Sequence, residues 1–300
     1  MTKCLVTGGA GYFGELLTRK LLERGYSVRV LDLDPPADIY PGTEMVQADI
    51  RDADAVLSAC EGIDVAFHNA AQGAMAKDKA LLWSVNRDGT KNLLESCARR
   101  AVKKVVYTSS SAVYGVPRSN PVTEETLPSP VEEYGRAKLA GEELCREYAG
   151  KGLDVSIVRP CTILGHGRLG IFQILFEWIY QGKNIPVLNG GKNIYQFVHA
   201  DDLAEACAFL LQQSAPPDLI NIGTGTDVTI KELTELVAQV TGFKGVIKWD
   251  ATKPDGTPRK LMDVSRLRAL GWQARIALAE GVQKTYASFL AEQAAGTLRN

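Results

Sequence analysis

The usual zinc ligands, histidine and closely spaced cysteine, are scarce in this sequence. Its 300 residues include three histidines and six cysteines, and no two cysteines form a Cys-x-x-Cys pair. Structural zinc sites need several such ligands at short spacings, so we expect no metal site. The cysteines are also too scattered to suggest a disulfide framework, and reduced thiols favour a cytoplasmic location.

Long apolar runs and an excess of charge of one sign are missing as well. The most apolar stretch, Ile171–Tyr180, is too short to span a bilayer and contains Glu177, so we expect a core helix or part of a substrate pocket there. The N-terminus leads directly into a strand pattern, without the apolar segment of a signal peptide. A net charge of −1 predicts no strong attraction to nucleic acid or to an anionic membrane.

The first half of the chain alternates between strand-like and helix-like patterns. Strands are expected at 3–7, 28–33, 45–48, 65–69, 104–109 and 155–159, and helices at 14–25, 52–60, 83–100 and 134–148. This alternation predicts an α/β fold, a Rossmann-type doubly wound parallel sheet with helices on both faces. We expect residues 1–160 to form a dinucleotide-binding domain.

After residue 160 the alternation becomes irregular. We expect residues 161–300 to form a smaller α/β lobe that binds mainly substrate and is partly interleaved with the first domain. Thr229 and Glu232 have the spacing of a capping box and predict the start of a helix. Residues 294–300 are expected to be frayed.

A glycine-rich turn follows the first predicted strand. Gly8, Gly11 and Gly14 have a Gly-x-x-Gly-x-x-Gly spacing, and Tyr12 and Phe13 lie between the last two. Glycines here permit a sharp turn, a close approach to phosphate and tight packing of helix on strand. The helix N-terminus that follows can bind a pyrophosphate through its free N–H groups. A glycine turn without a ligand is the alternative.

An acidic residue ends the second predicted strand. Asp32 lies 18 residues after Gly14, where a carboxylate can accept hydrogen bonds from the adenosine ribose. A carboxylate there repels a 2′-phosphate, which favours NAD over NADP. A surface aspartate at a strand end is the alternative. Asp49 and Ile50 end the third predicted strand and are candidates for contacts with adenine.

A tyrosine and a lysine are spaced to share one helix face. Tyr134 and Lys138 stand at i and i+4, and an ammonium near a phenol lowers its pKa. Tyr134 could therefore act as a general acid or base near neutral pH. Ser110 follows the fifth predicted strand, where its hydroxyl could bind a substrate oxygen. The alternatives are a solvated helix face and a polar turn.

These residues belong to a longer series of motifs. The series includes His68-Asn69-Ala70-Ala71, Val85-Asn86-x-x-Gly89-Thr90, Ser110-x-x-x-Tyr114-Gly115, Tyr134-x-x-x-Lys138, Arg159-Pro160 and Phe197-Val198-His199-Ala200-Asp201-Asp202. In this order they resemble the extended short-chain dehydrogenase/reductase family. More narrowly, they resemble its NAD-dependent epimerase/dehydratase branch, which acts on nucleotide sugars.

The resemblance implies one nicotinamide cofactor, NAD, and a substrate cleft between two lobes. It places the catalytic serine on Ser110, with Ser111 as the alternative, and Tyr134 and Lys138 also contact the cofactor. Further cofactor contacts fall on Ala70, Ala71, Thr108 and Pro160, and substrate contacts on Ser111, Thr162 and Arg259. Family members often dimerise, here through the helices predicted at 83–100 and 134–148.

The chain departs from the family pattern near the substrate. Dehydratases carry an Asp-Glu pair after the catalytic residue, where this chain has Ser111 and Ala112, which disfavours water elimination. Thr162 stands where nucleotide-sugar enzymes usually have Asn. The run from Lys253 to Lys260 resembles the corresponding part of GDP-fucose synthases and makes Arg259 the candidate diphosphate clamp. A surface charge in a loop is the alternative for Arg259.

The favoured hypothesis is an NAD-dependent nucleotide-sugar epimerase. Tyr134 would exchange a proton with the sugar hydroxyl, C4 being the expected carbon, through a transient keto intermediate. The alternative is an NAD(P)-dependent reductase or dehydrogenase of a ketosugar or of a less polar, hydroxysteroid-like substrate. A non-enzymatic dinucleotide sensor is a third hypothesis, which the presence of Ser110, Tyr134 and Lys138 together disfavours.

Overall fold

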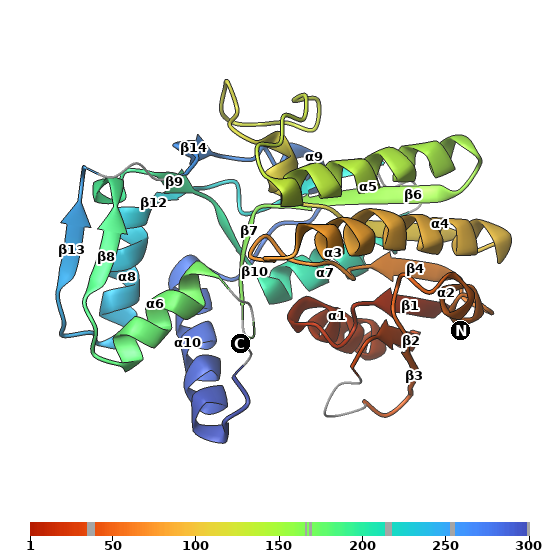
Figure 1. Ribbon diagram of the computed structural model, residues 1–300, viewed down its shortest axis with the longest axis horizontal. Helices are drawn as coiled ribbons and strands as arrows, with labels where there is room; N and C mark the ends of the chain where they lie inside the picture. The colour runs from red at the N-terminus through yellow and green to blue at the C-terminus, as the bar shows by residue number, and fades with distance from the viewer. Residues whose placement is uncertain (35–39, 166, 168–169, 214–217, 253–255, 299–300) are drawn as a thin grey trace.

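The computed structural model describes residues 1–34, 40–165, 167, 170–213, 218–252 and 256–298. Its main element is a seven-stranded parallel sheet in the order β11-β6-β5-β4-β1-β2-β3 (Figure 1). The strands are β1 (Lys3–Thr7), β2 (Ser27–Asp32), β3 (Thr43–Gln47), β4 (Val65–His68), β5 (Lys104–Thr108), β6 (Asp154–Pro160) and β11 (Leu219–Ile222). The order reverses at β1 and β4, where doubly wound sheets bind ligands at their carboxyl ends.

Helices cover both faces of this sheet. They are α1 (Tyr12–Glu23), α2 (Ala53–Ala59), α3 (Lys79–Trp83), α4 (Thr90–Arg99), α5 (Glu133–Gly150), α7 (Ala200–Leu210) and α9 (Ser265–Ala269). Successive residues of a strand point to opposite faces. In β1, Cys4 and Val6 pack in the core formed with α1 and α7, whereas Leu5 packs in the core formed with α2, α4 and α5. The predicted doubly wound α/β fold is confirmed.

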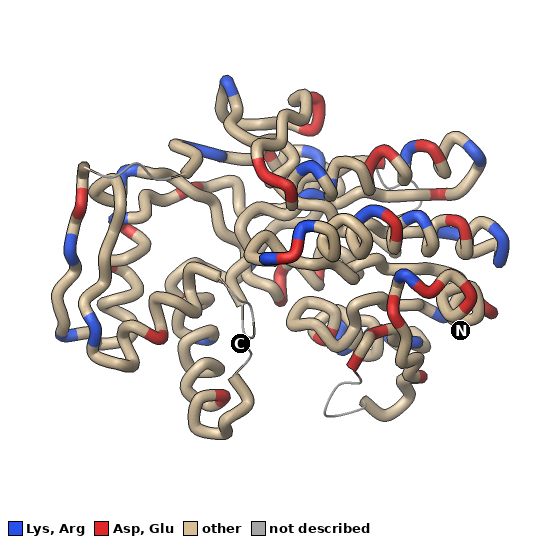
Figure 2. Tube along the Cα trace, viewed as in Figure 1, with Lys and Arg blue, Asp and Glu red and all other residues tan. Residues whose placement is uncertain are grey.

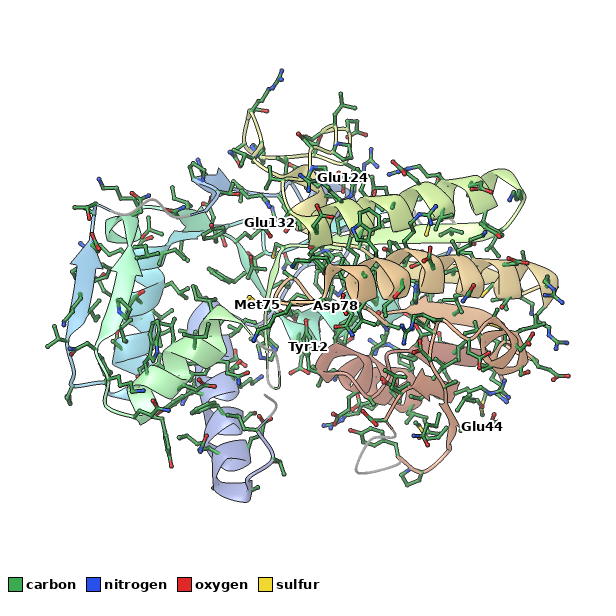
Figure 3. All side chains as sticks on the ribbon, viewed as in Figure 1. Tyr12, Glu44, Met75, Asp78, Glu124 and Glu132 are labelled. Atoms are coloured by element: carbon green, nitrogen blue, oxygen red, sulfur yellow. The ribbon has the colours of Figure 1, made fainter. Side chains whose placement is uncertain are left out.

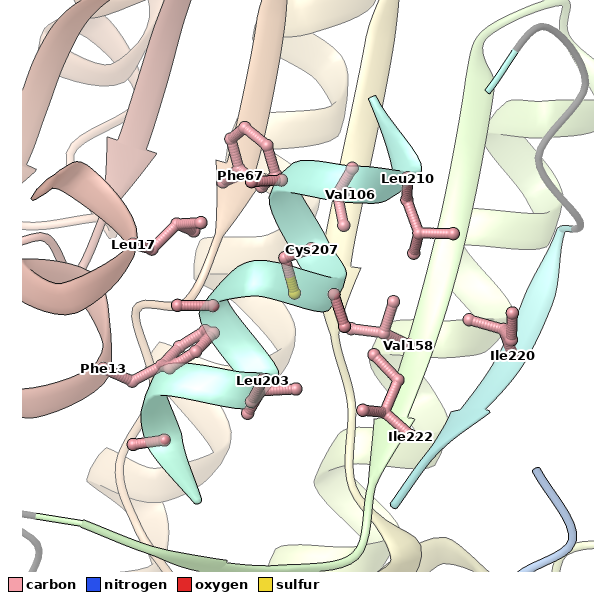
Figure 4. Packing of buried hydrophobic residues seen from close by; sticks show 14 of the residues in the cluster. Phe13, Leu17, Phe67, Val106, Val158, Leu203, Cys207, Leu210, Ile220 and Ile222 are labelled. Atoms are coloured by element: carbon pink, nitrogen blue, oxygen red, sulfur yellow. The ribbon is translucent and has the colours of Figure 1, made fainter. Parts of the chain in front are cut away.

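Three elements of this sheet layer, β11, α7 and α9, come from the chain after residue 160. The strand β11 pairs with β6, with Ile220 opposite Val158. The helix α7 lies against the sheet beside α1, and Figure 4 shows its Leu203 and Cys207 among side chains of the strands. The chain therefore crosses between the two lobes more than once. The domain boundary expected at residue 160 stays a prediction.

The second lobe holds short strands and helices. They are β7 (Thr162–Leu164), β8 (Ile185–Leu188), β9 (Ile194–Tyr195), β10 (Phe197–His199), β12 (Val228–Thr229), β13 (Ile247–Asp250), β14 (Arg259–Lys260), α6 (Ile171–Tyr180), α8 (Ile230–Thr241) and α10 (Leu278–Ala295). Phe172, Phe176 and Phe289 pack at the centre of its core, so α6 is a core helix as expected. In the part of the chain that the structure describes, no helix could cross a membrane.

Two helix predictions need correction. The helix expected at 83–100 begins earlier, as α3, and contains a π-helical turn at Ser84–Gly89 before α4. In this turn the Asn86 amide bonds the backbone of Gln72 in both directions, over 2.7 and 2.9 Å. The expected fraying from residue 294 is wrong at its start. The helix α10, whose Phe289 is buried, continues to residue 295 and ends at Gly296. Residues 299–300 lie outside the described part.

Charged side chains are interspersed on the outer helices. Figure 2 shows Lys and Arg alternating with Asp and Glu along α4 and α5. The two helices contact each other on one face of the sheet. The dimer expected through these helices stays a prediction.

The capping box predicted at Thr229 is confirmed at the start of α8, where Thr229 Oγ1 accepts from Glu232 N over 3.0 Å and the Glu232 side chain accepts from Thr229 N over 2.7 Å. We expect Thr229→Ala to lower the free energy of unfolding by about 1 kcal/mol. Urea denaturation measures this. Thr241→Ala is the control, because the Thr241 hydroxyl only bonds back to Val237 O and Ala238 O within the same helix. Equal losses in the two variants would contradict the cap's contribution.

Candidate active site

The glycine-rich turn brings the start of α1 close to the ends of β1 and β4. Gly8 has φ +68°, and a Cβ there would lie 2.7 Å from Ala70 N. A Cβ on Gly14 would lie 2.0 Å from Gly8 O, so a side chain at that position would force the helix away from the turn. Gly11 is the N-cap of α1 and has no side chain to cap its first turn. The N–H groups and the dipole of the helix are therefore available to an anion.

A cavity of about 530 Å³ opens beside this turn. Its volume is in the range of small-molecule sites. The predicted cofactor residues that line it are Gly8, Gly11, Tyr12, Phe13, Gly14, Asp32, Asp49, Ile50, Ala70 and Ala71. Sequence reasoning did not select the other lining residues, which are Ala10, Leu31, Leu33, Asp34, Ala48, Asn69, Gln72 and Val85. Figure 3 shows Tyr12 at the end of α1 that faces the second lobe.

The Asp32 carboxylate is held at the rim of this cavity by backbone groups. It accepts from Ala10 N and from Leu33 N, each over 2.8 Å. The bond to Ala10 joins the end of β2 to the glycine-rich turn. A carboxylate fixed beside the phosphate-binding turn is where an adenosine ribose would be bound.

The other two predicted adenine contacts differ in character. The Asp49 carboxylate pairs with Arg51 over 2.5 Å, and this guanidinium lowers the pKa of Asp49. Ile50 is buried, and a Cβ on Gly89 of the π-helical turn would lie 2.6 Å from its side chain. Ile50 therefore forms an apolar wall, whereas the Asp49 carboxylate is already engaged.

The first turn of α5 approaches the turn that follows β5. A Cβ on Gly135 would lie 2.7 Å from Ala112 O, so the glycine permits this contact. Ser110 starts the 3-10 turn Ser111–Tyr114, and its Oγ accepts from Ala112 N over 3.1 Å. The Ser110 hydroxyl proton is left available for another acceptor. The residue before Gly135 is Tyr134, so this packing brings the predicted acid/base residue next to the serine turn.

Lys138 is fixed one helical turn further along α5. Its Nζ donates to Thr108 O over 2.8 Å and lies 5.1 Å from the centre of the Tyr107 ring. The side chain is 3% exposed, and burial lowers the pKa of Lys138 to about 8, while the carboxylate of Glu142 opposes this shift.

Four predicted cofactor residues are not in the described lining of the cavity: Thr108, Tyr134, Lys138 and Pro160. A hydrogen bond between Thr108 and Asn69 connects the cavity with the region around Lys138. Thr108 Oγ1 donates to Asn69 Oδ1 over 2.6 Å, while Asn69 Nδ2 is buried and has no partner among the described residues. Asn69 lines the cavity, so this amide can donate to a ligand that extends from the cavity toward Lys138. The glycine turn, Asp32 and this amide fit a bound dinucleotide.

The predicted substrate residues are spread more widely. Arg259 pairs with Asp227, its Nε lying 2.7 Å from the carboxylate, so a diphosphate would have to share or displace this partner. Thr162 lines a separate cavity of about 70 Å³ beside α6. Ser111 O accepts from Lys260 Nζ over 3.2 Å. Sequence reasoning missed Lys260, although it follows the selected Arg259. Lys253–Asp255 of the same run lie outside the described residues.

The described residues contain no group of three His, Cys, Asp or Glu side chains placed to hold a metal ion. The six cysteines are free and buried.

The fold and this site define a dinucleotide-binding enzyme with a Tyr-x-x-x-Lys helix. The chain belongs to the NAD-dependent epimerase/dehydratase family, whose model matches residues 4–223. This membership confirms the predicted family, the enzymatic class and NAD as the cofactor.

Similar proteins cover nearly the whole chain. An uncharacterized protein of Sinorhizobium fredii is 49% identical over 89% of this chain and 67% of its own length. GDP-L-fucose synthase 1 of Arabidopsis thaliana is 33% identical, over 96% of this chain and 93% of its own. The solved UDP-glucose 4-epimerase of Thermotoga maritima, with UDP-glucose, superimposes with a TM-score of 0.89 at 25% identity and covers 97% of this chain and 100% of its own.

The charge of Asp32 should select NAD against NADP. In Asp32→Asn the oxygen can still accept from Ala10 N, but the repulsion of a 2′-phosphate is lost. We expect the ratio of the NAD to the NADP affinity to fall by about 10-fold or more, the effect of one charged hydrogen-bonding group. Calorimetric titration of cofactor-stripped protein with both dinucleotides measures it. Asp34→Asn, an exposed carboxylate on the same rim, is the matched control, and a similar fall there would contradict a specific role for Asp32.

Proposed function

We propose that this protein is an NAD-dependent epimerase of a nucleotide sugar that inverts carbon 4 through a transient keto intermediate. Family membership supports the use of NAD. The likeness to the Thermotoga maritima enzyme, which was solved with UDP-glucose, supports a nucleotide sugar as substrate. The observation that carries the proposal is the close packing of the first turn of α5 on the serine turn, because Tyr134 precedes Gly135 in the helix and Ser110 precedes the turn that Gly135 contacts.

Three side chains of this region would perform the proton chemistry. Bound NAD would supply an acceptor and then a donor of hydride. Tyr134 takes the proton of the hydroxyl group on carbon 4 and later returns it, acting as base and then as acid. Ser110 donates a hydrogen bond to the same oxygen and so stabilises the charge that develops there. The Lys138 ammonium favours the phenolate form of Tyr134. The reaction has no net oxidation.

The substrate diphosphate would lie near the cations of β14. Lys260 reaches the serine turn from the second lobe, and burial lowers the pKa of Lys260. Arg259 is the neighbouring cation and is 44% exposed. We propose that both cations contact the diphosphate, Arg259 by sharing its guanidinium between Asp227 and a phosphate oxygen.

Apolar side chains near Thr162 favour a second candidate function. The cavity that Thr162 lines is otherwise formed by Ile163, Gly165, Gly170, Ile171 and Phe172. A net reductase or dehydrogenase of a ketosugar or a less polar, hydroxysteroid-like substrate would suit such a surface.

Retention of the cofactor separates the two functions, because a net reductase must exchange it at every turnover. For the epimerase we expect mass spectrometry of the purified protein to detect stoichiometric NAD, and dilution in buffer not to remove it. Free exchange of NAD or NADP during turnover would favour the reductase.

The Tyr134 phenol carries the proposed proton transfer. With a panel of UDP- and GDP-hexoses, we expect the unaltered protein to interconvert one pair of 4-epimers. Tyr134→Phe should lower kcat by about 100- to 10,000-fold, the usual contribution of a general acid or base, with NAD still bound. Tyr148→Phe, on the same helix, is the control and should retain full activity. Turnover by Tyr134→Phe at the rate of the control would contradict the mechanism.

Lys138 should set the pH at which Tyr134 ionises. Removing the ammonium in Lys138→Met favours the neutral phenol, so the pKa of Tyr134 rises. The acidic limb of the pH profile of kcat should therefore move to higher pH in this variant. An unchanged limb, measured with NAD bound at saturation, would contradict the coupling of the two groups.

A further inference from the structure

One buried carboxylate on α5 has no part in the proposed chemistry. Glu142 follows Tyr134 and Lys138 at the same four-residue spacing, so the three side chains share one face of the helix. The Glu142 side chain is fully buried, with 0% exposure. A carboxylate is rarely buried unless other groups pair with it, so its partners indicate what it holds in place.

The partners of Glu142 lie on three elements. Arg159 of β6 donates to it through Nε over 2.7 Å and through Nη2 over 2.5 Å. Ser109 Oγ donates to Oε1 over 2.6 Å, and Arg146 of α5 donates to Oε2 over 2.8 Å. Burial alone would raise the pKa of Glu142, but the bonds from Arg159 and Ser109 outweigh it and lower that pKa. The group is therefore a charged carboxylate inside the protein.

Glu142 acts on the residue that precedes the catalytic serine. Lys138 Nζ binds Thr108 O over 2.8 Å, and Glu142 binds Ser109 Oγ over 2.6 Å. Two side chains one helical turn apart thus hold two successive residues of the chain that leaves β5. The next residue is Ser110. These two bonds fix the position of the segment that follows β5 along the axis of α5.

The same carboxylate also acts on the far end of the serine turn. The Arg159 guanidinium that it holds lies 4.6 Å from the centre of the Tyr114 ring. Tyr114 is the last residue of the 3-10 turn, and its hydroxyl donates to Asn221 over 2.8 Å. Glu142 therefore supports the turn on both sides of Ser110. A buried ion pair contributes little to stability in general, which leaves positioning as the better account of it.

We propose that Glu142 is a positioning residue of the active site, which fixes through Ser109 and Arg159 where the Ser110 hydroxyl stands relative to the Tyr134 phenol. The inference rests on the proposed function, because it concerns the same proton transfer. Ser110 touches the substrate oxygen in that proposal, whereas Glu142 and Ser109 act only through it.

The decisive variant is Ser109→Ala, which removes one hydrogen bond and leaves the Glu142–Arg159 pair intact. Ser156→Ala is the matched control, because Ser156 is 1% exposed on the adjacent strand β6 and its hydroxyl has no partner among the described residues. With the hexose nucleotide that turns over best, we expect kcat of Ser109→Ala to fall about 10- to 100-fold, as misplaced catalytic groups do. KM and the retention of NAD should change less than about twofold, since binding energy is not removed. The control should match the unaltered protein.

Several results would overturn the inference. One is a kcat for Ser109→Ala equal to that of Ser156→Ala. Another is unfolding of Ser109→Ala at a temperature where Ser156→Ala is folded, which would make the bond a structural one. Glu142→Gln is the second variant, and when folded it should lower kcat at least as far as Ser109→Ala does. Full activity in Glu142→Gln would also overturn the inference. Failure of the unaltered protein to turn over any nucleotide sugar would instead contradict the proposed function, and the inference with it.

Discussion

The contact between the first half of α5 and the carboxyl end of β5 is the constraint on which the proposed site depends. Gly135 lets the helix touch the backbone of Ala112, and Lys138 ties the helix to Thr108. Both contacts involve backbone atoms, so they fix the two elements rather than only their side chains. Tyr134 precedes Gly135 on the helix and Ser110 lies two residues before Ala112, so both proposed residues are neighbours of this contact in the chain.

The two lobes contribute to the site in different ways. Among the described residues, the cavity proposed for the dinucleotide is lined only by the first lobe, from the glycine turn to Val85. The cations proposed to contact the substrate diphosphate, Arg259 and Lys260, come from residues after 160, whereas Ser110 and Tyr134 come from the first lobe, and Lys260 reaches back to the serine turn. An enzyme of this form can keep its cofactor in a preformed site while the second lobe changes to suit another substrate. Thr162, which departs from the family pattern, and the Asp227–Arg259 pair both belong to the second lobe.

The sequence predicted those parts of the fold that depend on residues close together in the chain. The glycine turn needs φ above zero at Gly8 and close approach at Gly14, which few other residues permit. The strands of the first half were predicted from the alternation of strand-like and helix-like patterns. The capping box was predicted from the spacing of Thr229 and Glu232. All ten predicted cofactor residues between Gly8 and Ala71 line the cavity.

The features that the sequence did not predict depend on contacts between segments that are far apart in the chain. The turn of π-helix and the role of Asn69 arise from partners elsewhere in the chain, such as Gln72 and Thr108. The helix α10 has a buried face that is set by the second-lobe core, so the sequence alone did not reveal it. No pattern separates the engaged Arg259 from the neighbouring Lys260, because Asp227 meets Arg259 only in the folded chain.

The central claim is that carbon 4 of a nucleotide sugar loses and regains the same hydride while Tyr134 moves only the proton. The most direct test is turnover of the substrate carrying deuterium at carbon 4, in ordinary water, followed by mass spectrometry of both epimers. The account predicts that the deuterium stays on carbon 4 in the product. Its replacement by solvent hydrogen would contradict hydride transfer and the role proposed for this site.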